Sequence, residues 1–216
     1  MATMKIIIVC LTIFYTHTFI AAQNYLVFPA SVVSLNNSLS FDSSLQLLKQ
    51  NSLNIDKNSL QKAILLKKAG HQFQNLGKHE YARDAFQKAL DINELVFGKE
   101  SMEYNRALLD LSSAYMLLIR YYEAAGMYQE VQIAVLQLAG EQSLEYWHTL
   151  NENAIVFAKT RQWVKARNSC REALQLMDQY KHQDPLQRAV VYNNLGAVYK
   201  NQWQFSKAVD AYEMSM

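Results

Sequence analysis

The sequence predicts an all-α fold made of repeated pairs of antiparallel helices. An alanine recurs at intervals of 42 residues, at Ala82, Ala124, Ala166 and Ala208. Nine residues before each alanine is an aromatic ring: Phe73, Tyr115, Phe157 and Tyr199. The 216 residues include only 6 glycines and 2 prolines, and no alternating strand pattern recurs. A period of this length with few chain breakers is typical of a helical repeat array.

Four further columns keep the same period. Small residues stand twelve before each alanine, at Gly70, Ser112, Ala154 and Gly196. Rings stand three before it, at His79, Tyr121, Trp163 and Phe205. Bulky or sulfur-containing side chains stand four after it, at Phe86, Tyr128, Cys170 and Tyr212. Small residues or valine stand seven after it, at Ala89, Val131, Ala173 and Ser215. Because the columns repeat together, each one predicts a fixed packing position.

Within one unit, the columns predict two helices. Gly70 and Phe73 are three residues apart and share one face of the first helix. The apolar stripe of the second helix consists of Ala82, Ala85, Phe86, Ala89 and Leu90. Gly77 lies between them and predicts the turn. A single hairpin cannot bury its apolar face, so we expect the units to stack as a solenoid.

The period also predicts the domain boundaries. The four units are expected at about 59–100, 101–142, 143–184 and 185–216, with the array continuing beyond the chain. Asp184 and Pro185 fit an N-cap and first helical residue for the fourth unit. Residues 41–58 are expected to form a short capping helix and a link, because Leu45, Leu47 and Leu48 could cover the first unit.

At these residues the sequence resembles the tetratricopeptide repeat family. The segment from Leu76 to Ala82, followed by Phe86 and Ala89–Leu90, matches the family pattern, as do Leu195–Gly196, Tyr199 and Ala208. The resemblance implies a right-handed superhelix of antiparallel helix pairs. The 42-residue length is similar to repeats of kinesin light chain and of bacterial CHAT-domain proteases. Ile119 and Arg161 replace the turn glycine and Asn153 replaces a usual leucine, which we expect to weaken two turns but preserve the packing.

The first 22 residues differ in kind and predict a secretory signal. Lys5 precedes an apolar run from Ile6 to Tyr15, and small residues precede a cleavage point after Ala22. The expected location is therefore secreted or periplasmic. An uncleaved membrane anchor is the alternative, although the run is short of about 20 apolar residues. Residues 23–40 lack a period and are expected to form a flexible tether.

No catalytic or cofactor pattern accompanies the repeats. Outside the signal, His71, His79, His148 and His182 lack the spacing of metal ligands or of an acid–base pair. We therefore expect no enzyme activity, cofactor or metal site in these residues. Cys170 and His79 occupy packing columns. The net charge of +2 forms no basic stripe, so a nucleic-acid partner is not expected.

The family resemblance implies a concave groove lined by the first helices, which would bind a protein or peptide. The expected lining residues, beside Lys68, are Lys67, His71, Asn75, Arg106, Asp110, Ser113, His148, Asn151, Glu152, Lys159, Asn193, Asn194, Lys200 and Asn201. Asn151 and Asn193 are one period apart, so their amides are expected in one row suited to a peptide backbone. Asp110 and Glu152 disfavour binding of a terminal carboxylate and favour a neutral or mixed-charge peptide. A solvated polar face without a ligand is the alternative.

The end of the chain supports the expectation of further packing. Ala208, Val209 and Tyr212 are predicted to face the position of a following helix, provided by more chain or by self-association. The expected function is an exported protein-interaction scaffold that binds a peptide in the groove. The alternatives are a regulatory array of a larger enzyme, such as a CHAT-type caspase-like protease, and a membrane-tethered assembly factor.

Overall fold

The computed structural model describes residues 40–49, 59–181 and 184–216. The expected signal and most of the tether, as well as His182, lie outside these residues. The described part contains helices and turns and no strand. The helices are α2 (Phe41–Lys49), α3 (Ser59–Asn75), α4 (His79–Phe97), α5 (Met102–Leu117), α6 (Tyr121–Ala139), α7 (Leu144–Lys159), α8 (Trp163–Gln179), α9 (Pro185–Asn201) and α10 (Phe205–Glu213). The predicted all-α fold is confirmed.

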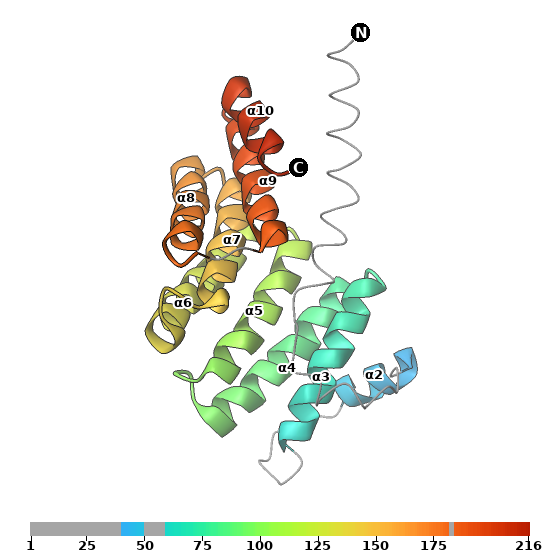
Figure 1. Cartoon of the computed structure of the whole chain (residues 1–216). Helices are drawn as coiled ribbons and strands as arrows, with labels where there is room; N and C mark the ends of the chain where they lie inside the picture. The colour runs from blue at the N-terminus through green and yellow to red at the C-terminus, as the bar shows by residue number, and fades with distance from the viewer. Residues whose placement is uncertain (1–39, 50–58, 182–183) are drawn as a thin grey trace. The chain divides into compact units, whose positions relative to one another are not determined.

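The helices from α3 onward form consecutive hairpins stacked in chain order (Figure 1). Each helix packs mainly against its neighbours in sequence. Some helices also contact the helix two places further along the chain: α3 contacts α5, and α7 contacts α9. Each of these is the first helix of its hairpin. These contacts place first helices side by side, and we call the side of the stack formed by α3, α5, α7 and α9 its inner side.

The recurring alanines and the small-residue column explain how each hairpin closes. Ala82, Ala124 and Ala166 are fully buried. A Cβ atom added at Gly70 would overlap the ring of Phe86 from the paired helix. Small side chains at these positions therefore let the two helices of a hairpin approach closely enough to bury the large ring.

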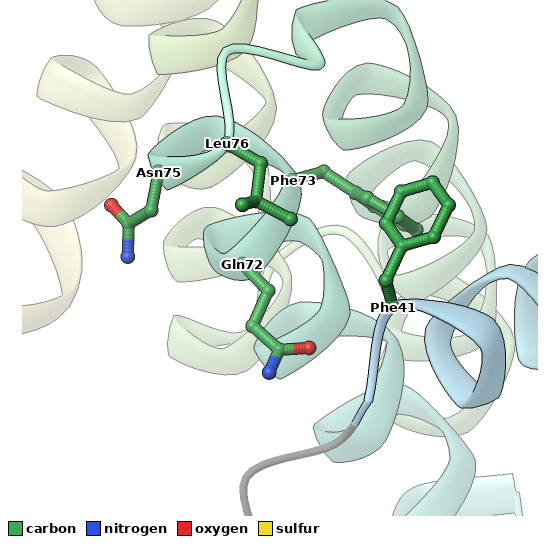
Figure 2. A pocket seen from close by; sticks show the side chains of 5 residues that line it. All are labelled: Phe41, Gln72, Phe73, Asn75 and Leu76. Carbon is green, nitrogen blue, oxygen red and sulfur yellow. The ribbon is translucent and has the colours of Figure 1, made fainter.

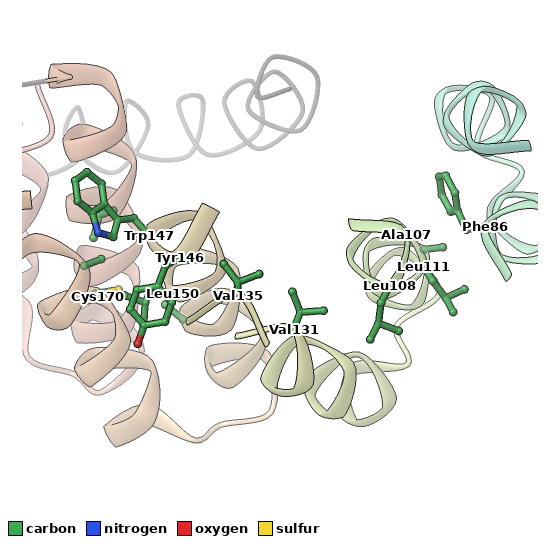
Figure 3. Packing of buried hydrophobic residues seen from close by; sticks show 14 of the residues in the cluster. Phe86, Ala107, Leu108, Leu111, Val131, Val135, Tyr146, Trp147, Leu150 and Cys170 are labelled. Atoms are coloured by element: carbon green, nitrogen blue, oxygen red, sulfur yellow. The ribbon is translucent and has the colours of Figure 1, made fainter. Parts of the chain in front are cut away.

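The core continues from one hairpin to the next without a break (Figure 3). Val131 and Val135 of α6 and Leu150 of α7 are almost fully buried in the same cluster. Cys170 of α8 is fully buried in this cluster, and burial raises the pKa of its thiol to about 12. A thiol held in its neutral form behaves as a small apolar side chain, which fits the predicted packing role.

The turn inside each hairpin has the same backbone geometry, whether or not it contains glycine. The residues at this position have positive φ angles: Gly77 at 68°, Ile119 at 64°, Arg161 at 59° and Trp203 at 61°. The amide after each of them donates to a carbonyl five residues earlier, as Lys78 does to Phe73 at 2.8 Å. This arrangement is a Schellman-type helix end. The three non-glycine residues keep the turn at a cost in backbone strain.

Hydroxyl and carboxylate caps begin the first helices. The side chains of Ser101 and Ser143, one period apart, accept hydrogen bonds from the amides of Tyr104 and Tyr146 at 3.1 Å. In the fourth unit, Asp184 accepts bonds from the first turn of α9, and proline follows it. The predicted cap at Asp184 is confirmed. These caps satisfy amides that have no partner within the helix.

Helix α2 packs against the first hairpin in the place of the second helix of a preceding unit, although it is only 9 residues long. Its buried residues Ser44 and Leu48 stand one period before Phe86 and Leu90. Ser44 donates to Gln72 of α3 at 2.7 Å, and Lys88 of α4 donates to the carbonyl of Leu48. The helix thus supplies the contacts that a preceding unit would make.

The prediction for the last helix is wrong at two positions. Ala208 is 3% exposed and Tyr212 is half-buried, whereas Val209 is exposed. The Tyr212 ring lies against Gly196, so that a Cβ atom added there would come within 2.8 Å of it. Ala208 and Tyr212 therefore complete their own hairpin with α9, because the small residue of α9 accepts the ring, and only Val209 faces outward.

Candidate binding surface on the first helices

Charged side chains connect α3 to α5 on the inner side of the stack. Lys67 of α3 forms an ion pair with Asp110 of α5 at 2.7 Å, and the His71 ring lies 3.5 Å from the same carboxylate. Gln74 of α3 donates to Ser113 of α5 at 2.9 Å. The structure thus brings Lys67, His71, Asp110 and Ser113 together, as predicted for one surface.

Similar contacts join the remaining first helices. Arg106 of α5 forms an ion pair with Glu145 of α7 at 3.3 Å. Asn194 of α9 donates to the side-chain oxygen of Asn151 of α7 at 2.7 Å. Separate polar contacts therefore join α3 to α5, α5 to α7 and α7 to α9, and we call the side of the stack formed by these four helices the inner face. Side chains that hold one another have restricted rotamers before any ligand arrives.

The two amides expected in one row, Asn151 and Asn193, differ in their contacts. Asn151 is 9% exposed, and its side-chain oxygen accepts a hydrogen bond from Asn194. The half-buried Asn193 lies one residue earlier on α9. Asn151 meets Asn194 because adjacent units are staggered: the two residues are 43 positions apart, one more than the period. Asn151 acts mainly as a contact between helices.

The two carboxylates predicted to repel an anion differ in their neighbours. Asp110 lies between Lys67 and His71. Glu152 accepts a hydrogen bond from the Tyr128 hydroxyl at 3.4 Å and lies 4.0 Å from His148. Burial, followed by the proximity of Glu152, raises the pKa of Tyr128, which keeps that hydroxyl a donor. Lys67 therefore offsets the charge of Asp110, whereas Glu152 has no lysine or arginine among these neighbours.

The other predicted residues lie toward the ends of the first helices. Asn201 donates to the carbonyl of Ala197 in its own helix at 2.8 Å, and Lys159 lies 5.9 Å above the ring of Tyr121. Lys200 is exposed at the end of α9. These side chains flank the inner face and are not part of its central contacts.

A hollow of about 380 Å³ lies at the end of α3 beside α2 (Figure 2). Its lining is Phe41, Gln72, Phe73, Asn75 and Leu76. The ring of Phe41 packs edge-on against that of Phe73, with centroids 5.7 Å apart. Sequence reasoning named Asn75 for the groove, but it did not identify the apolar Phe41 and Leu76 beside it.

Sequence reasoning also missed two apolar residues of the inner face. Ile64 and Val190 share one 42-residue column with Arg106 and His148. Ile64 is exposed and Val190 is half-buried. The period could have identified them, because every residue of a column takes the same position on its helix. At this position, the inner face is therefore polar on α5 and α7 and apolar on α3 and α9.

Two other features concern metal binding and membrane crossing. Within residues 40–49, 59–181 and 184–216, histidine, cysteine and acidic side chains form no cluster able to hold a metal ion. Among the helices of that same part of the chain, none combines the length and apolar character needed to cross a bilayer.

Comparisons with known proteins agree with the geometry. A family model described as tetratricopeptide repeat matches residues 188–216. The BtubC (BKLC) protein of P. vanneervenii superposes with a TM-score of 0.66 at 20% identity, over 81% of this chain and 68% of that one. A putative kinesin light chain from Podospora anserina gives 0.68 at 12% identity, over 81% and 83%. MamA gives 0.53 at 15% identity, over 81% and 84%. No curated protein matches the sequence.

The repeat columns, the stacked hairpins and the match to the fourth unit define the class. The chain has an all-α solenoid fold of the tetratricopeptide-repeat type, and the family model matches its fourth unit. Solenoids of this kind generally serve as scaffolds for protein–protein interaction, because stacked repeats present an extended surface.

Proposed function

We propose that this protein is an interaction scaffold that binds an extended protein segment along the inner face. The observation that carries the proposal is the set of polar contacts, from Lys67–Asp110 to Asn151–Asn194, that join each first helix to the next. A surface whose side chains are already held in place loses less conformational entropy on binding. A row of donors and acceptors with apolar ends fits a peptide of mixed character.

Several side chains of the inner face still reach solvent and are available to a ligand. The side chains of His148 and Arg106 are 45% and 41% exposed. Asn193 is half-buried, and its amide can both donate and accept. Ile64 offers an exposed apolar contact at the α3 end. A ligand that spans these residues contacts each first helix, so specificity arises from several units together.

Binding to a library of random linear peptides tests this proposal. Peptides enriched on the full chain are expected to bind at least about tenfold more weakly to a His148→Ala/Asn193→Ala variant, because two central contacts are lost. An Asn168→Ala variant is the matched control, since Asn168 is exposed on the second helix α8. Failure to enrich any peptide, or equal binding by all three proteins, would contradict the proposal.

We also propose that the scaffold is exported. The support is the sequence of residues 1–22, with Lys5 before an apolar run and small residues before Gln23. Mass spectrometry of the protein from its native host is expected to find a mature chain that starts at Gln23. A mature protein that retains Met1 would contradict cleavage and favour the anchored alternative.

A further inference from the structure

The turns of the third and fourth hairpins present large apolar side chains to solvent. Val164, the second residue of α8, is 57% exposed. Phe205 begins α10 and is 56% exposed, and Trp203, two residues before it, is 80% exposed. The rings of Trp203 and Phe205 contact each other edge-on, with centroids 5.9 Å apart. Both turns lie at the same end of their hairpins, because each joins a first helix to its second helix (Figure 1).

Trp203 is held in a conformation that is unfavourable for a tryptophan. Its φ angle of 61° lies in the left-handed region, where the first unit has Gly77 at the equivalent position. The strained backbone and the exposed indole both make tryptophan an unfavourable residue at this position in a protein without a partner. The same strain occurs at Ile119 and Arg161, so the feature particular to the fourth turn is an indole that is 80% exposed.

The same two turns carry only positive charge. No acidic residue occurs between 153 and 171 or between 185 and 209. The basic residues at or beside the two turns are Lys159, Arg161, Lys165, Lys200 and Lys207. Lys165 and Lys207 lie 5.4 and 5.8 Å from the centroids of the buried rings of Phe157 and Tyr199, which places one lysine beside each turn.

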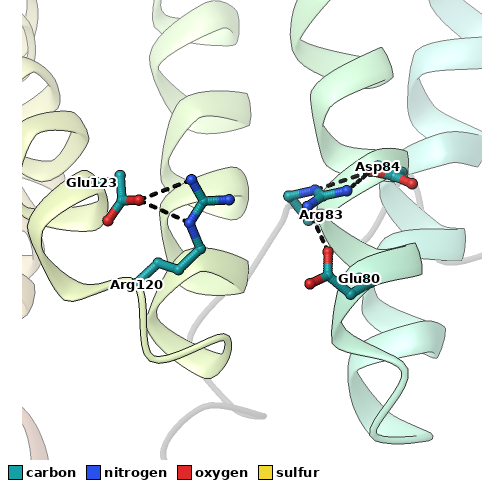
Figure 4. A network of polar contacts seen from close by, with 5 residues as sticks. All are labelled: Glu80, Arg83, Asp84, Arg120 and Glu123. Carbon is teal, nitrogen blue, oxygen red and sulfur yellow. Dashed lines mark hydrogen bonds and ion pairs between the residues drawn. The ribbon is translucent and has the colours of Figure 1, made fainter.

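The turns of the first two hairpins differ, because acidic residues offset their cations (Figure 4). Arg83 pairs with Glu80 at 2.5 Å and also with Asp84. Arg120 pairs with Glu123 at 2.8 Å, and a backbone hydrogen bond and this arginine lower the pKa of Glu123. The third and fourth turns thus have an excess of basic over acidic residues that the first two turns lack.

The links at the opposite ends of the hairpins carry the opposite charge. Their acidic residues are Glu94, Glu100, Glu103, Glu141, Glu145, Asp178 and Asp184. Their basic residues are Lys99, Lys181 and Arg188. The stack therefore has an acidic edge and a basic edge, and the exposed tryptophan lies on the basic one. A negatively charged surface would attract the basic edge and repel the acidic one.

We propose that the third and fourth turns dock the solenoid onto an anionic lipid bilayer. The turns project from the stack. Their apolar side chains can therefore insert into a bilayer, but they do not form a pocket around a ligand. Tryptophan prefers the headgroup region, where its ring is buried and its N–H stays solvated. Lysine and arginine beside it approach lipid phosphates, and the absence of carboxylates avoids repulsion. The strained Trp203 turn holds the indole outward for insertion.

Vesicle co-sedimentation with the full chain tests the charge requirement. Binding is expected to vesicles of phosphatidylcholine with phosphatidylglycerol, to be much weaker with phosphatidylcholine alone, and to fall as salt is raised. A Lys165→Gln/Lys207→Gln variant is expected to bind the anionic vesicles about 30-fold more weakly. Equal binding to both vesicle types would overturn the proposal, as would an absence of binding, which would favour an acidic protein partner.

A second variant tests insertion of the rings. Trp203→Gly/Phe205→Ser is expected to fold, since glycine suits the left-handed turn, and to bind anionic vesicles at least about tenfold more weakly. Tryptophan emission of the unsubstituted chain should shift to the blue on binding. Leu144→Ser/Leu186→Ser is the matched control, because it removes two exposed apolar residues near the acidic links. Residues 1–22 are present in every protein, so equal binding by all of them would assign attachment elsewhere and overturn the proposal.

Discussion

Substituting Ala124→Arg is expected to lower the free energy of unfolding by several kcal/mol. Ala124 is fully buried and packs in a cluster with Ala125, Tyr128 and Val156, which belong to two successive hairpins. An arginine there either buries an unpaired charge or forces the hairpins apart. Losses of this size come from few mechanisms, and an uncompensated charge in a close-packed interface is one of them.

Gly126→Arg is the matched control for this charge. Gly126 lies two residues further along α6, is exposed, and has no atom within 4 Å of an added Cβ. Its free energy of unfolding is expected to stay within about 0.5 kcal/mol of the parent chain, or to rise, because arginine also favours the helix. Urea unfolding followed by circular dichroism measures both. Equal effects of the two arginines would mean that the 42-residue alanine column does not mark the buried side of the second helix.

Gly70→Ala is expected to cost about 1–3 kcal/mol of unfolding free energy, although alanine is ordinarily the better helix former. The new methyl group would overlap the ring of Phe86, which is 1% exposed. The ring has little room to move, because the His71 ring packs against it with centroids 5.0 Å apart. Overpacking against a confined ring strains either the side chain or the helix pair.

The same substitution at Gly126 should have the opposite sign. Gly126→Ala meets open space within a helix, so the free energy of unfolding is expected to rise by about 0.5–1 kcal/mol. Thermal unfolding of both variants distinguishes packing from helix propensity. A Gly70→Ala protein more stable than its parent would show that the first hairpin does not close on Phe86.

The fold was predictable because the period records local packing. Gly70 and Phe86 belong to two sequence columns, and the structure places them in contact within one hairpin. The same contact recurs in the fourth hairpin, where the ring of Tyr212 lies against Gly196. The same reasoning placed Cys170 in the core, where it is fully buried. Packing of this kind depends only on spacing along two short helices.

The polar contacts of the inner face were less predictable. Which amide bonds to Asn151 depends on the stagger between units: the partner is Asn194, whereas the 42-residue period relates Asn151 to Asn193 only as an equivalent position. The observed contacts between units instead follow spacings of 39 and 43 residues, a period minus three or plus one. Residues at those spacings lie on the facing sides of adjacent first helices. Such contacts could be predicted from the sequence only if the stagger between units were already known.

The conformation of the fourth turn could not be predicted from residue type. Glycine at position 77 indicates a left-handed residue, whereas tryptophan at 203 does not. Only the shared 42-residue register relates the two positions. Tertiary packing of the hairpin overrides the local preference of the side chain there, and the same holds for Ile119.

Photo-crosslinking tests the binding claim most directly. A photoreactive amino acid is placed either at position 68, half-buried on the first helix α3, or at position 168, exposed on the second helix α8. A peptide enriched on the full chain is then irradiated with each protein. We expect a covalent adduct from position 68 and none from position 168. An adduct formed only from position 168 would contradict the assignment of the inner face as the binding surface.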